Sequence, residues 1–127
     1  QVIAAHATGW LWPVKGTVVQ GFTQKDKSIT IAGGAFAPVA AAKSGKVIFA
    51  GFGVKRLGKM IIIQHAGGFL TAYGHNAKLL VKEGQQVKAG DTIAEMGPVK
   101  KSNRGEVIFE IRYGGQSVNP VLYLPTM

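Results

Sequence analysis

Among the His, Asp and Glu side chains of this 127-residue sequence, which can bind metal ions and exchange protons, three are candidates for a common site: Asp26, His75 and Glu106. A catalytic zinc ion uses three such protein ligands and keeps a further position open for water. The three residues lie far apart in the chain, so only the fold can bring them together. A metal site built from these three residues is therefore one hypothesis. Cysteine is absent, which excludes a thiolate metal site and a disulfide framework.

The segment GEVIFEIR places one unexpected residue beside Glu106. Side chains of a β-strand alternate between its two faces. One face of this segment is apolar and consists of Val107, Phe109 and Ile111. The other face is charged apart from one member and consists of Glu106, Ile108, Glu110 and Arg112. Ile108 interrupts that charged row, and an aliphatic side chain cannot bind a metal ion.

The elements that must position these residues are short β-strands. Runs rich in β-branched and aromatic residues follow at close spacing and are punctuated by glycine, which is typical of an all-β domain. We expect strands over residues 16–22, 28–32, 38–42, 46–52, 59–65, 69–74, 78–81, 86–88, 92–96, 106–113 and 117–118. No segment has the periodicity of an amphipathic helix. The nearly continuous apolar run MIIIQH predicts a strand that is central in the sheet or buried on both faces.

The length suits one domain with one hydrophobic core. Residues 1–9 lack clear periodicity and are interpreted as a linker remnant, which leaves residues 10–127 as the domain. No apolar run is long enough to cross a bilayer. We therefore expect membrane attachment only through an anchor upstream of Gln1.

Charge restricts the class of partner. The net charge is +9, from 15 Lys and Arg against 6 Asp and Glu, which favours polyanionic or acidic partners. The basic residues are scattered, and neither an RNA-binding aromatic motif nor a helix-turn-helix pattern accompanies them. We expect no nucleic-acid partner and no cofactor.

Seven fragments carry a resemblance to a known family: WPVKGTVVQGF, ITIA, PVAAAKSGKVIFAG, IIIQHAGGFLTAYGH, VKEGQQVKAGDTIAEMG, FEIR and VNPVLYLP. In order and spacing they resemble the LytM, or lysostaphin-type, zinc metallopeptidase family, from Trp12 to Pro125. Members of that family cut peptide cross-links in bacterial cell walls. The resemblance implies a single all-β domain of antiparallel sheets, with an open groove over the central sheet.

Active members bind zinc through a His-x-x-x-Asp motif and the second His of a His-x-His motif. The match of DKSITIA and GEVIFEIR to these motifs implies three vestigial ligand positions, which are Asp26, Thr30 and Ile108. The family's catalytic residues are the His of a Tyr-x-His motif and the first His of His-x-His, so the resemblance also implies two vestigial catalytic positions, which are His75 in TAYGH and Glu106 in GEVIFEIR. Threonine is a poor zinc ligand and isoleucine is none. The resemblance therefore implies a domain that has lost its metal site and is not an enzyme.

Loss of the ligands leaves the groove in place. The chain resembles the degenerate branch of the family, of the NlpD and EnvC kind and nearer to NlpD, whose members activate cell-wall amidases during daughter-cell separation in Gram-negative bacteria. This implies a periplasmic zinc amidase as partner, bound through its regulatory helix. It also implies a periplasmic location, with an outer-membrane lipoprotein as the full-length form. We expect the partner-binding groove to contain Lys27, Thr30, Leu57, Tyr73, His75, Glu106, Ile108 and Arg112.

Within that groove, Ile108 is expected to form the floor of an apolar pocket together with Leu57 and Tyr73, which would receive apolar anchors of a helix. Lys27 and Arg112 are expected to pair with acidic residues of the partner. Simpler alternatives are that Tyr73 only packs in the protein and that Arg112 only neutralises Glu110.

Two further hypotheses remain open, an adaptor module and a residual metallopeptidase whose altered metal site is built from Asp26, His75 and Glu106. The basic surface and the inherited cleft are also compatible with a peptidoglycan-binding adaptor that activates no amidase. His65, at the end of the run IIIQH, is interpreted as a structural histidine with satisfied hydrogen bonds and not as a ligand.

Overall fold

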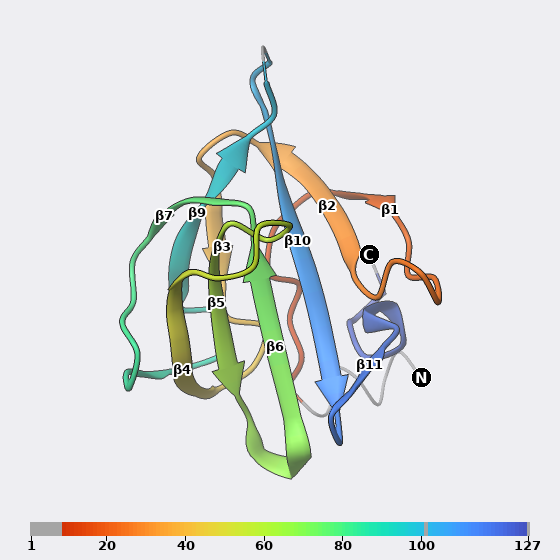
Figure 1. Ribbon diagram of the computed structural model, residues 1–127, viewed down its shortest axis with the longest axis vertical. Helices are drawn as coiled ribbons and strands as arrows, with labels where there is room; N and C mark the ends of the chain where they lie inside the picture. The colour runs from red at the N-terminus through yellow and green to blue at the C-terminus, as the bar shows by residue number, and fades with distance from the viewer. Residues whose placement is uncertain (1–8, 101, 127) are drawn as a thin grey trace.

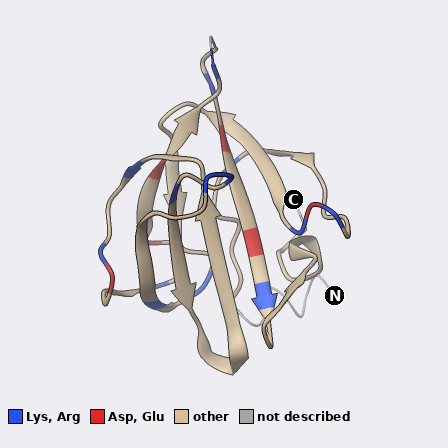
Figure 2. Cartoon of the chain, viewed as in Figure 1, with Lys and Arg blue, Asp and Glu red and all other residues tan. Residues whose placement is uncertain are grey.

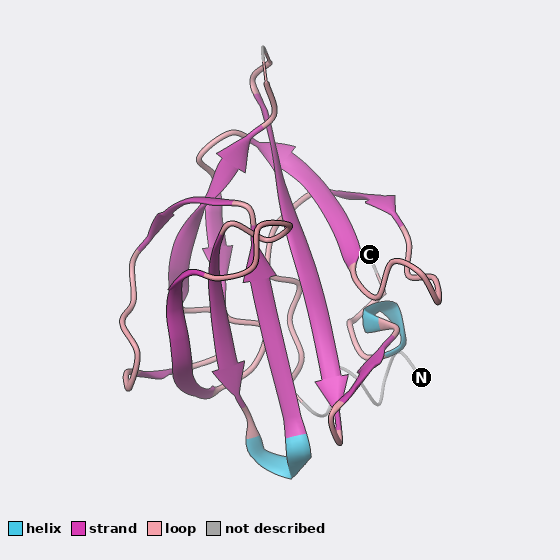
Figure 3. Cartoon of the chain, in the orientation of Figure 1, coloured by secondary structure: helices cyan, strands magenta, loops and turns pink. Residues whose placement is uncertain are grey.

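The computed structural model describes residues 9–100 and 102–126, which form short strands and two short 3-10 turns (Figure 3). The strands are β1 (Thr17–Gln20), β2 (Ile29–Gly34), β3 (Pro38–Ala40), β4 (Gly45–Phe52), β5 (Lys59–Gln64), β6 (Phe69–Gly74), β7 (Asn76–Leu79), β8 (Gln86–Val87), β9 (Thr92–Pro98), β10 (Arg104–Tyr113) and β11 (Gln116–Val118). The 3-10 turns are η1 (Ala66–Gly68) and η2 (Pro120–Leu122). The all-β fold expected from the sequence is confirmed. The proposed linker, residues 1–9, lies almost wholly outside the described residues.

Only β6 has the expected bounds; the other strands differ from them by one or two residues at one or both ends, and the causes of two of these shifts are visible. β7 begins at Asn76 and not at residue 78, because the Asn76 side-chain amide donates 2.9 Å hydrogen bonds to the carbonyl groups of Lys59 and Tyr73. These bonds fix the chain against β5 and β6 directly after the turn at its start. β10 begins at Arg104 because its antiparallel pairing with β2 continues to that residue.

The strands form one large antiparallel sheet with a smaller sheet attached. The large sheet has the order β1-β2-β10-β6-β5-β4-β8. β9 pairs with the start of β10 and also with β3 and β7, which together make the smaller sheet. In Figure 1, β10 is the long strand that runs through the middle of the large sheet, between β2 and β6. β5 lies between β4 and β6, which confirms the central position expected for MIIIQH.

The main core lies on one face of the large sheet. Strand alternation supplies its fully buried members, which include Ile29, Ile31, Ile61, Ile63, Tyr73, Val107, Phe109 and Ile111. They pack against side chains of the smaller sheet, including Val39, Ile93 and Met96. Each fully buried side chain of this size contributes about 1.5–3 kcal/mol to stability. The apolar face predicted for the segment GEVIFEIR is thus part of the core.

The opposite face of the large sheet, which we call the outer face, carries the alternate side chains. Cross-strand pairing places Ile108 of β10 between Thr30 of β2 and Gly74 of β6. Two residues further along β10, Glu110 lies opposite Ala72, which in turn lies opposite Ile62 of β5. Among the residues that the sequence linked to function, the outer face therefore holds Thr30, Ile108 and Arg112.

Charged residues are distributed unevenly over the fold. Figure 2 shows basic residues spread over the loops, while acidic and basic residues follow one another along β10. Within the described part of the chain, no helix has the length and apolar character that a membrane crossing requires.

Candidate functional site

Two of the three vestigial ligand positions are neighbours on the outer face. Thr30 and Ile108 are direct cross-strand partners, and both side chains are half-buried. Asp26 lies on the exposed turn before β2, where its backbone N–H donates a 2.8 Å hydrogen bond to the Thr23 hydroxyl group. The fold thus brings Thr30 and Ile108 together as the resemblance implied. The hydroxyl group of Thr30 is a poor zinc ligand and the aliphatic side chain of Ile108 is none, so the pair does not form a zinc site.

The backbone of His75, next to these positions, is held in an unusual conformation by its hydrogen bonds. It has a φ of 68°, a left-handed conformation that non-glycine residues rarely adopt and that costs about 1–3 kcal/mol. Its N–H donates to the Leu57 carbonyl group at 2.7 Å, and its carbonyl group accepts from Gly97 at 2.8 Å. A Cβ atom at Gly97 would collide with that same carbonyl oxygen. The surrounding chain therefore holds His75 in a strained position.

The two vestigial catalytic residues are in contact. The imidazole Nδ1 of His75 lies 2.8 Å from the carbonyl oxygen of Glu106 and donates to it. This bond leaves Nε2 as the nitrogen that remains for a ligand. Glu106 itself is half-buried on the outer face, opposite Ala32 of β2. The bond positions the imidazole against the backbone of Glu106 but supplies no set of metal ligands.

The hypothesis of an altered metal site built from Asp26, His75 and Glu106 finds no support in the geometry. Residues 9–100 and 102–126 contain no group of three or more His, Cys, Asp or Glu side chains that is able to hold a metal ion. Isoleucine at position 108 offers hydrocarbon where a ligand atom would be needed. The residues present at these positions do not fit a zinc ion.

Tyr73 does not line the groove, and this expectation is corrected. Its side chain is fully buried, with its ring 5.3 Å from that of Phe109. Its hydroxyl oxygen accepts a 3.0 Å hydrogen bond from the Ala42 N–H, and burial raises the pKa of Tyr73 to about 12. The reason is alternation along FLTAYG: Phe69, Thr71 and Tyr73 share the core side, so Gly74 faces outward. The alternative that Tyr73 only packs is the correct one.

His65 is a structural residue, as the sequence interpretation held. It is buried, and its Nδ1 donates to the Ser44 carbonyl group at 2.7 Å. Its Nε2 lies 2.8 Å from the Thr71 hydroxyl oxygen, which is hydrogen-bonded to the Tyr73 hydroxyl group at 2.7 Å. Burial, as the main cause, lowers the pKa of His65 below its usual value. Both ring nitrogens are satisfied inside the protein, so neither faces the groove.

Ile108 belongs to a second, smaller apolar cluster on the outer face. The buried members of the cluster are Leu57, Met60 and Ala72, and Phe49, Ile62 and Ile108 pack against them. Leu57 reaches the sheet from the β4–β5 loop, residues 53–58. The missing side chain of Gly74 makes this approach possible, since a Cβ atom there would lie 2.9 Å from the Leu57 side chain. Ile108 is therefore separate from the main core and close to solvent, as the groove interpretation requires.

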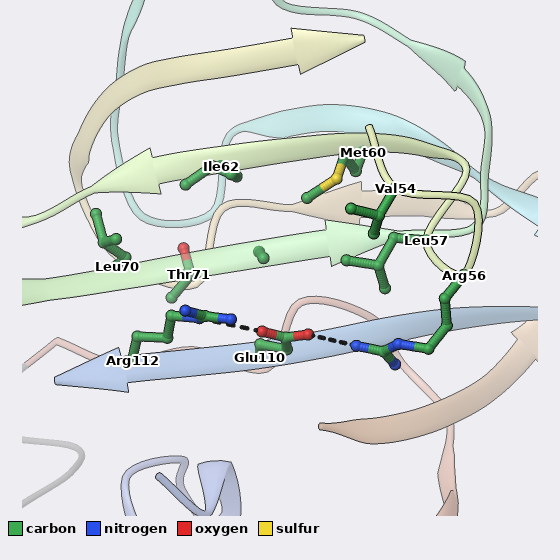
Figure 4. A pocket seen from close by; sticks show the side chains of 10 residues that line it. Val54, Arg56, Leu57, Met60, Ile62, Leu70, Thr71, Glu110 and Arg112 are labelled. Atoms are coloured by element: carbon green, nitrogen blue, oxygen red, sulfur yellow. Dashed lines mark hydrogen bonds and ion pairs between the residues drawn. The ribbon is translucent and has the colours of Figure 1, made fainter. Parts of the chain in front are cut away.

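A pocket of about 310 Å³ opens next to this cluster, and we call it the anchor pocket. Figure 4 shows its lining, which is Val54, Arg56, Leu57, Met60, Ile62, Leu70, Thr71, Ala72, Glu110 and Arg112. Glu110 is buried between two arginines, with Oε2 2.9 Å from Arg56 Nη2 and Oε1 3.4 Å from Arg112 Nε. Arg112 thus neutralises Glu110, as the simpler alternative held, and it also lines a pocket.

Sequence reasoning missed most of the anchor pocket. Met60, Ile62, Leu70 and Ala72 share the outer face by strand alternation, so the signal was present in MIIIQH and FLTAYG. Arg56 gave no such signal, because it reaches Glu110 from a loop across 54 residues of sequence. The expected groove cations do come together: Lys27 and Arg112 line a neighbouring polar hollow of about 530 Å³, with Phe22, Gln24, Gln116 and Ser117.

Comparisons with known proteins show what the chain is similar to. Residues 24–120 match the family model described as peptidase family M23. The chain is 46% identical over 128 residues to the lipoprotein NlpD/LppB homolog of Pseudomonas aeruginosa, covering 98% of this chain and 43% of that protein. It is 44% identical over 119 residues to the murein hydrolase activator NlpD of Escherichia coli, covering 91% of this chain and 31% of that protein. The chain thus spans less than half the length of these relatives.

A solved structure has a similar fold. A zinc containing peptidase from Vibrio cholerae superposes with a TM-score of 0.76 at 27% sequence identity, over 87% of this chain and 39% of that chain. The neighbour's name includes the metal, whereas the outer face of this chain presents Thr30 and Ile108.

Proposed function

This chain belongs to peptidase family M23, and we propose that it is a non-catalytic activator of a periplasmic cell-wall amidase, an N-acetylmuramoyl-L-alanine amidase. It binds the regulatory segment of the amidase in the vestigial active-site groove. The amidase, once released from its own inhibition, splits septal peptidoglycan during daughter-cell separation. The domain itself performs no hydrolysis.

The observation that carries the proposal is a preserved scaffold with replaced ligands. Thr30 and Ile108 are paired on the outer face, and His75 is still held in its strained conformation beside them. Strain of this kind persists only when the surrounding structure over-determines it. A groove that keeps its shape without its metal is suited to binding and not to catalysis.

The side chains of the groove support a helical ligand. An amphipathic helix in a groove presents apolar anchors at i, i+3 or i+4, and i+7. Ile108 and Leu57 provide an apolar floor for such anchors, and Lys27 and Arg112 stand at an exposed polar edge. The cations orient an acidic segment and raise the association rate more than the affinity itself.

The relatives support the same role and location. NlpD of Escherichia coli is named a murein hydrolase activator, and the Pseudomonas aeruginosa relative is named a lipoprotein. From these names we infer an activator of a cell-wall hydrolase that is part of a lipoprotein, and we propose that the full-length form is anchored in the outer membrane. The amidase as the specific partner is our proposal.

Dye release from labelled sacculi tests the proposal. The purified domain is mixed with each periplasmic amidase of the source organism and with dye-labelled peptidoglycan. We expect stimulated dye release with at least one amidase and none from the domain alone. Dye release by the domain alone would mean that it is a hydrolase, and failure to stimulate any amidase would refute activation.

A peptidoglycan-binding adaptor is the second candidate, favoured by the polar hollow that Lys27 and Arg112 line with Gln24 and Gln116. Carboxylates of the peptide stems would meet two cations there. A pull-down on purified sacculi distinguishes the two functions. Strong, salt-sensitive retention without amidase stimulation would favour the adaptor.

A further inference from the structure

The anchor pocket has a floor that is apolar and an edge that is cationic. Leu57, Met60, Ile62, Leu70 and Ala72 supply hydrocarbon, and Arg56 and Arg112 stand on either side of Glu110 (Figure 4). Its volume of about 310 Å³ is at the lower end of the range for ligand sites. Ile108 does not line it, so the pocket is distinct from the vestigial ligand positions. A small, partly enclosed apolar site of this kind suits a single side chain of a partner.

The two arginines are positioned before any partner arrives. The buried Glu110 carboxylate binds one arginine through each oxygen atom, while the arginine side chains remain 56% and 49% exposed. Each guanidinium group has five N–H donors, and Glu110 and the 3.5 Å contact of Arg56 with Ser28 use only a few of them. Because both side chains are already ordered, binding a further acceptor costs less rotamer entropy.

The charges of this cluster do not cancel. Two guanidinium groups and one carboxylate leave a formal excess of one positive charge at the pocket edge. The whole chain carries +9, so the long-range field also attracts an acidic partner. A carboxylate from a partner would neutralise the excess and form charge-assisted hydrogen bonds with the free guanidinium donors.

The spacing along β10 fits a helix. Ile108 and Glu110 are two residues apart on one face of the strand, or about 7 Å. One turn of a helix rises about 5.4 Å, and residues three or four apart lie on the same face. A helix that follows β10 therefore places one residue over Ile108 and another, one turn on, over the anchor pocket.

We propose that the anchor pocket receives an aliphatic side chain of the amidase's regulatory helix, and that Arg56 and Arg112 bind a carboxylate one helical turn away. This inference rests on the proposed function and names the recognition element on the partner. The partner segment is thus an amphipathic helix that carries a leucine, isoleucine or methionine with an aspartate or glutamate three or four residues from it.

Two variants with matched controls test the inference. Arg112→Glu reverses the charge at the pocket edge, and Arg104→Glu makes the same change in net charge at an exposed site at the other end of β10. Ala72→Leu fills the pocket from its floor, and Ala77→Leu adds the same atoms on β7, outside the pocket. Affinity for the amidase that the wild-type domain stimulates is measured by biolayer interferometry, and circular dichroism melting confirms folding.

We expect Arg112→Glu and Ala72→Leu to weaken binding about tenfold or more, and both controls to remain within about twofold of the wild type. An Asp-to-Lys or Glu-to-Lys change in the amidase's regulatory segment should restore binding to Arg112→Glu. If both pocket variants bind as the wild type does while the wild type stimulates the amidase, the pocket inference is wrong and the activator function stands. If the wild type stimulates no amidase, both the pocket inference and the activator function are wrong. Where Arg112→Glu unfolds because it adds a second carboxylate beside Glu110, Ala72→Leu alone decides.

Discussion

Replacing Ile108 by aspartate should abolish amidase activation and leave the domain folded. Ile108 is half-buried on the outer face, where it packs against the small cluster of Leu57, Met60 and Ala72 and not against the main core. The substitution therefore removes apolar contact from the groove floor and introduces a negative charge there. It leaves the core face of β10 untouched.

The two costs differ enough to separate folding from binding. Losing the partial burial of one isoleucine side chain costs about 1 kcal/mol. Partial desolvation of the new carboxylate adds about 1–2 kcal/mol. The sum is well below the 5–15 kcal/mol that a domain of this size usually has, so the variant should fold. In the complex the partner would cover position 108 fully, and we expect a loss of at least about 2 kcal/mol, or about thirtyfold in affinity.

Dye release measures activation and circular dichroism melting measures folding. Ile48→Asp is the matched control, because Ile48 is also a strand isoleucine but is 36% exposed, lies on β4 and lines no described part of the groove. We expect the control to activate as the wild type does, and Ile108→Lys to fail as Ile108→Asp does. Full activation by Ile108→Asp would refute the groove, and unfolding of this variant would mean that Ile108 belongs to the core.

Three further predictions concern pH, backbone strain and the lost metal. Burial lowers the pKa of His65 in the folded state, so the unfolded chain binds the proton more readily. The contribution of neutral His65 to the free energy of unfolding should therefore be fully present above the usual pKa of 6.5 and should be lost as the pH falls below it. Thermal melts across about pH 5–8 check this, and a flat profile would contradict it. Gly97→Ala should lower the free energy of unfolding by about 1–3 kcal/mol, and with it the melting temperature, because the new Cβ atom collides with the His75 carbonyl oxygen. An unchanged melting temperature would mean that the backbone around Gly97 shifts without cost. The triple variant Asp26→His, Thr30→Asp and Ile108→His should bind about one zinc ion per chain, measured by elemental analysis, because Thr30 and Ile108 are still paired across the strands. A metal content equal to that of the wild type would show that the geometry of the zinc site is lost.

The fold followed from the sequence because its signals are local. Short β-rich runs separated by glycine predicted each strand, and errors were confined to strand ends such as that of β7. Those ends depend on long-range contacts, here the bonds of the Asn76 side chain to Lys59 and Tyr73, which no local pattern reveals.

The candidate site was predicted less completely. Ile108 was assigned to the correct face because alternation along β10 is regular, and the same rule applied to β6 would have placed Tyr73 in the core. Glu110 was assigned to the charged face of its strand, and nothing in the sequence indicated its burial, which arises because an arginine from the β4–β5 loop closes over it. A loop contact of this kind depends on the path of the chain in space, so residue types and spacing do not predict it.

Isoleucine methyl NMR of the domain, titrated with the amidase, tests the central claim most directly, because it requires no substitution. The claim is that the amidase binds across the outer face at the vestigial active site. It predicts that the methyl signals of Ile108 and Ile62 shift or broaden on binding, while that of Ile48 does not. Unchanged Ile108 and Ile62 signals in a sample where the amidase is bound would contradict it.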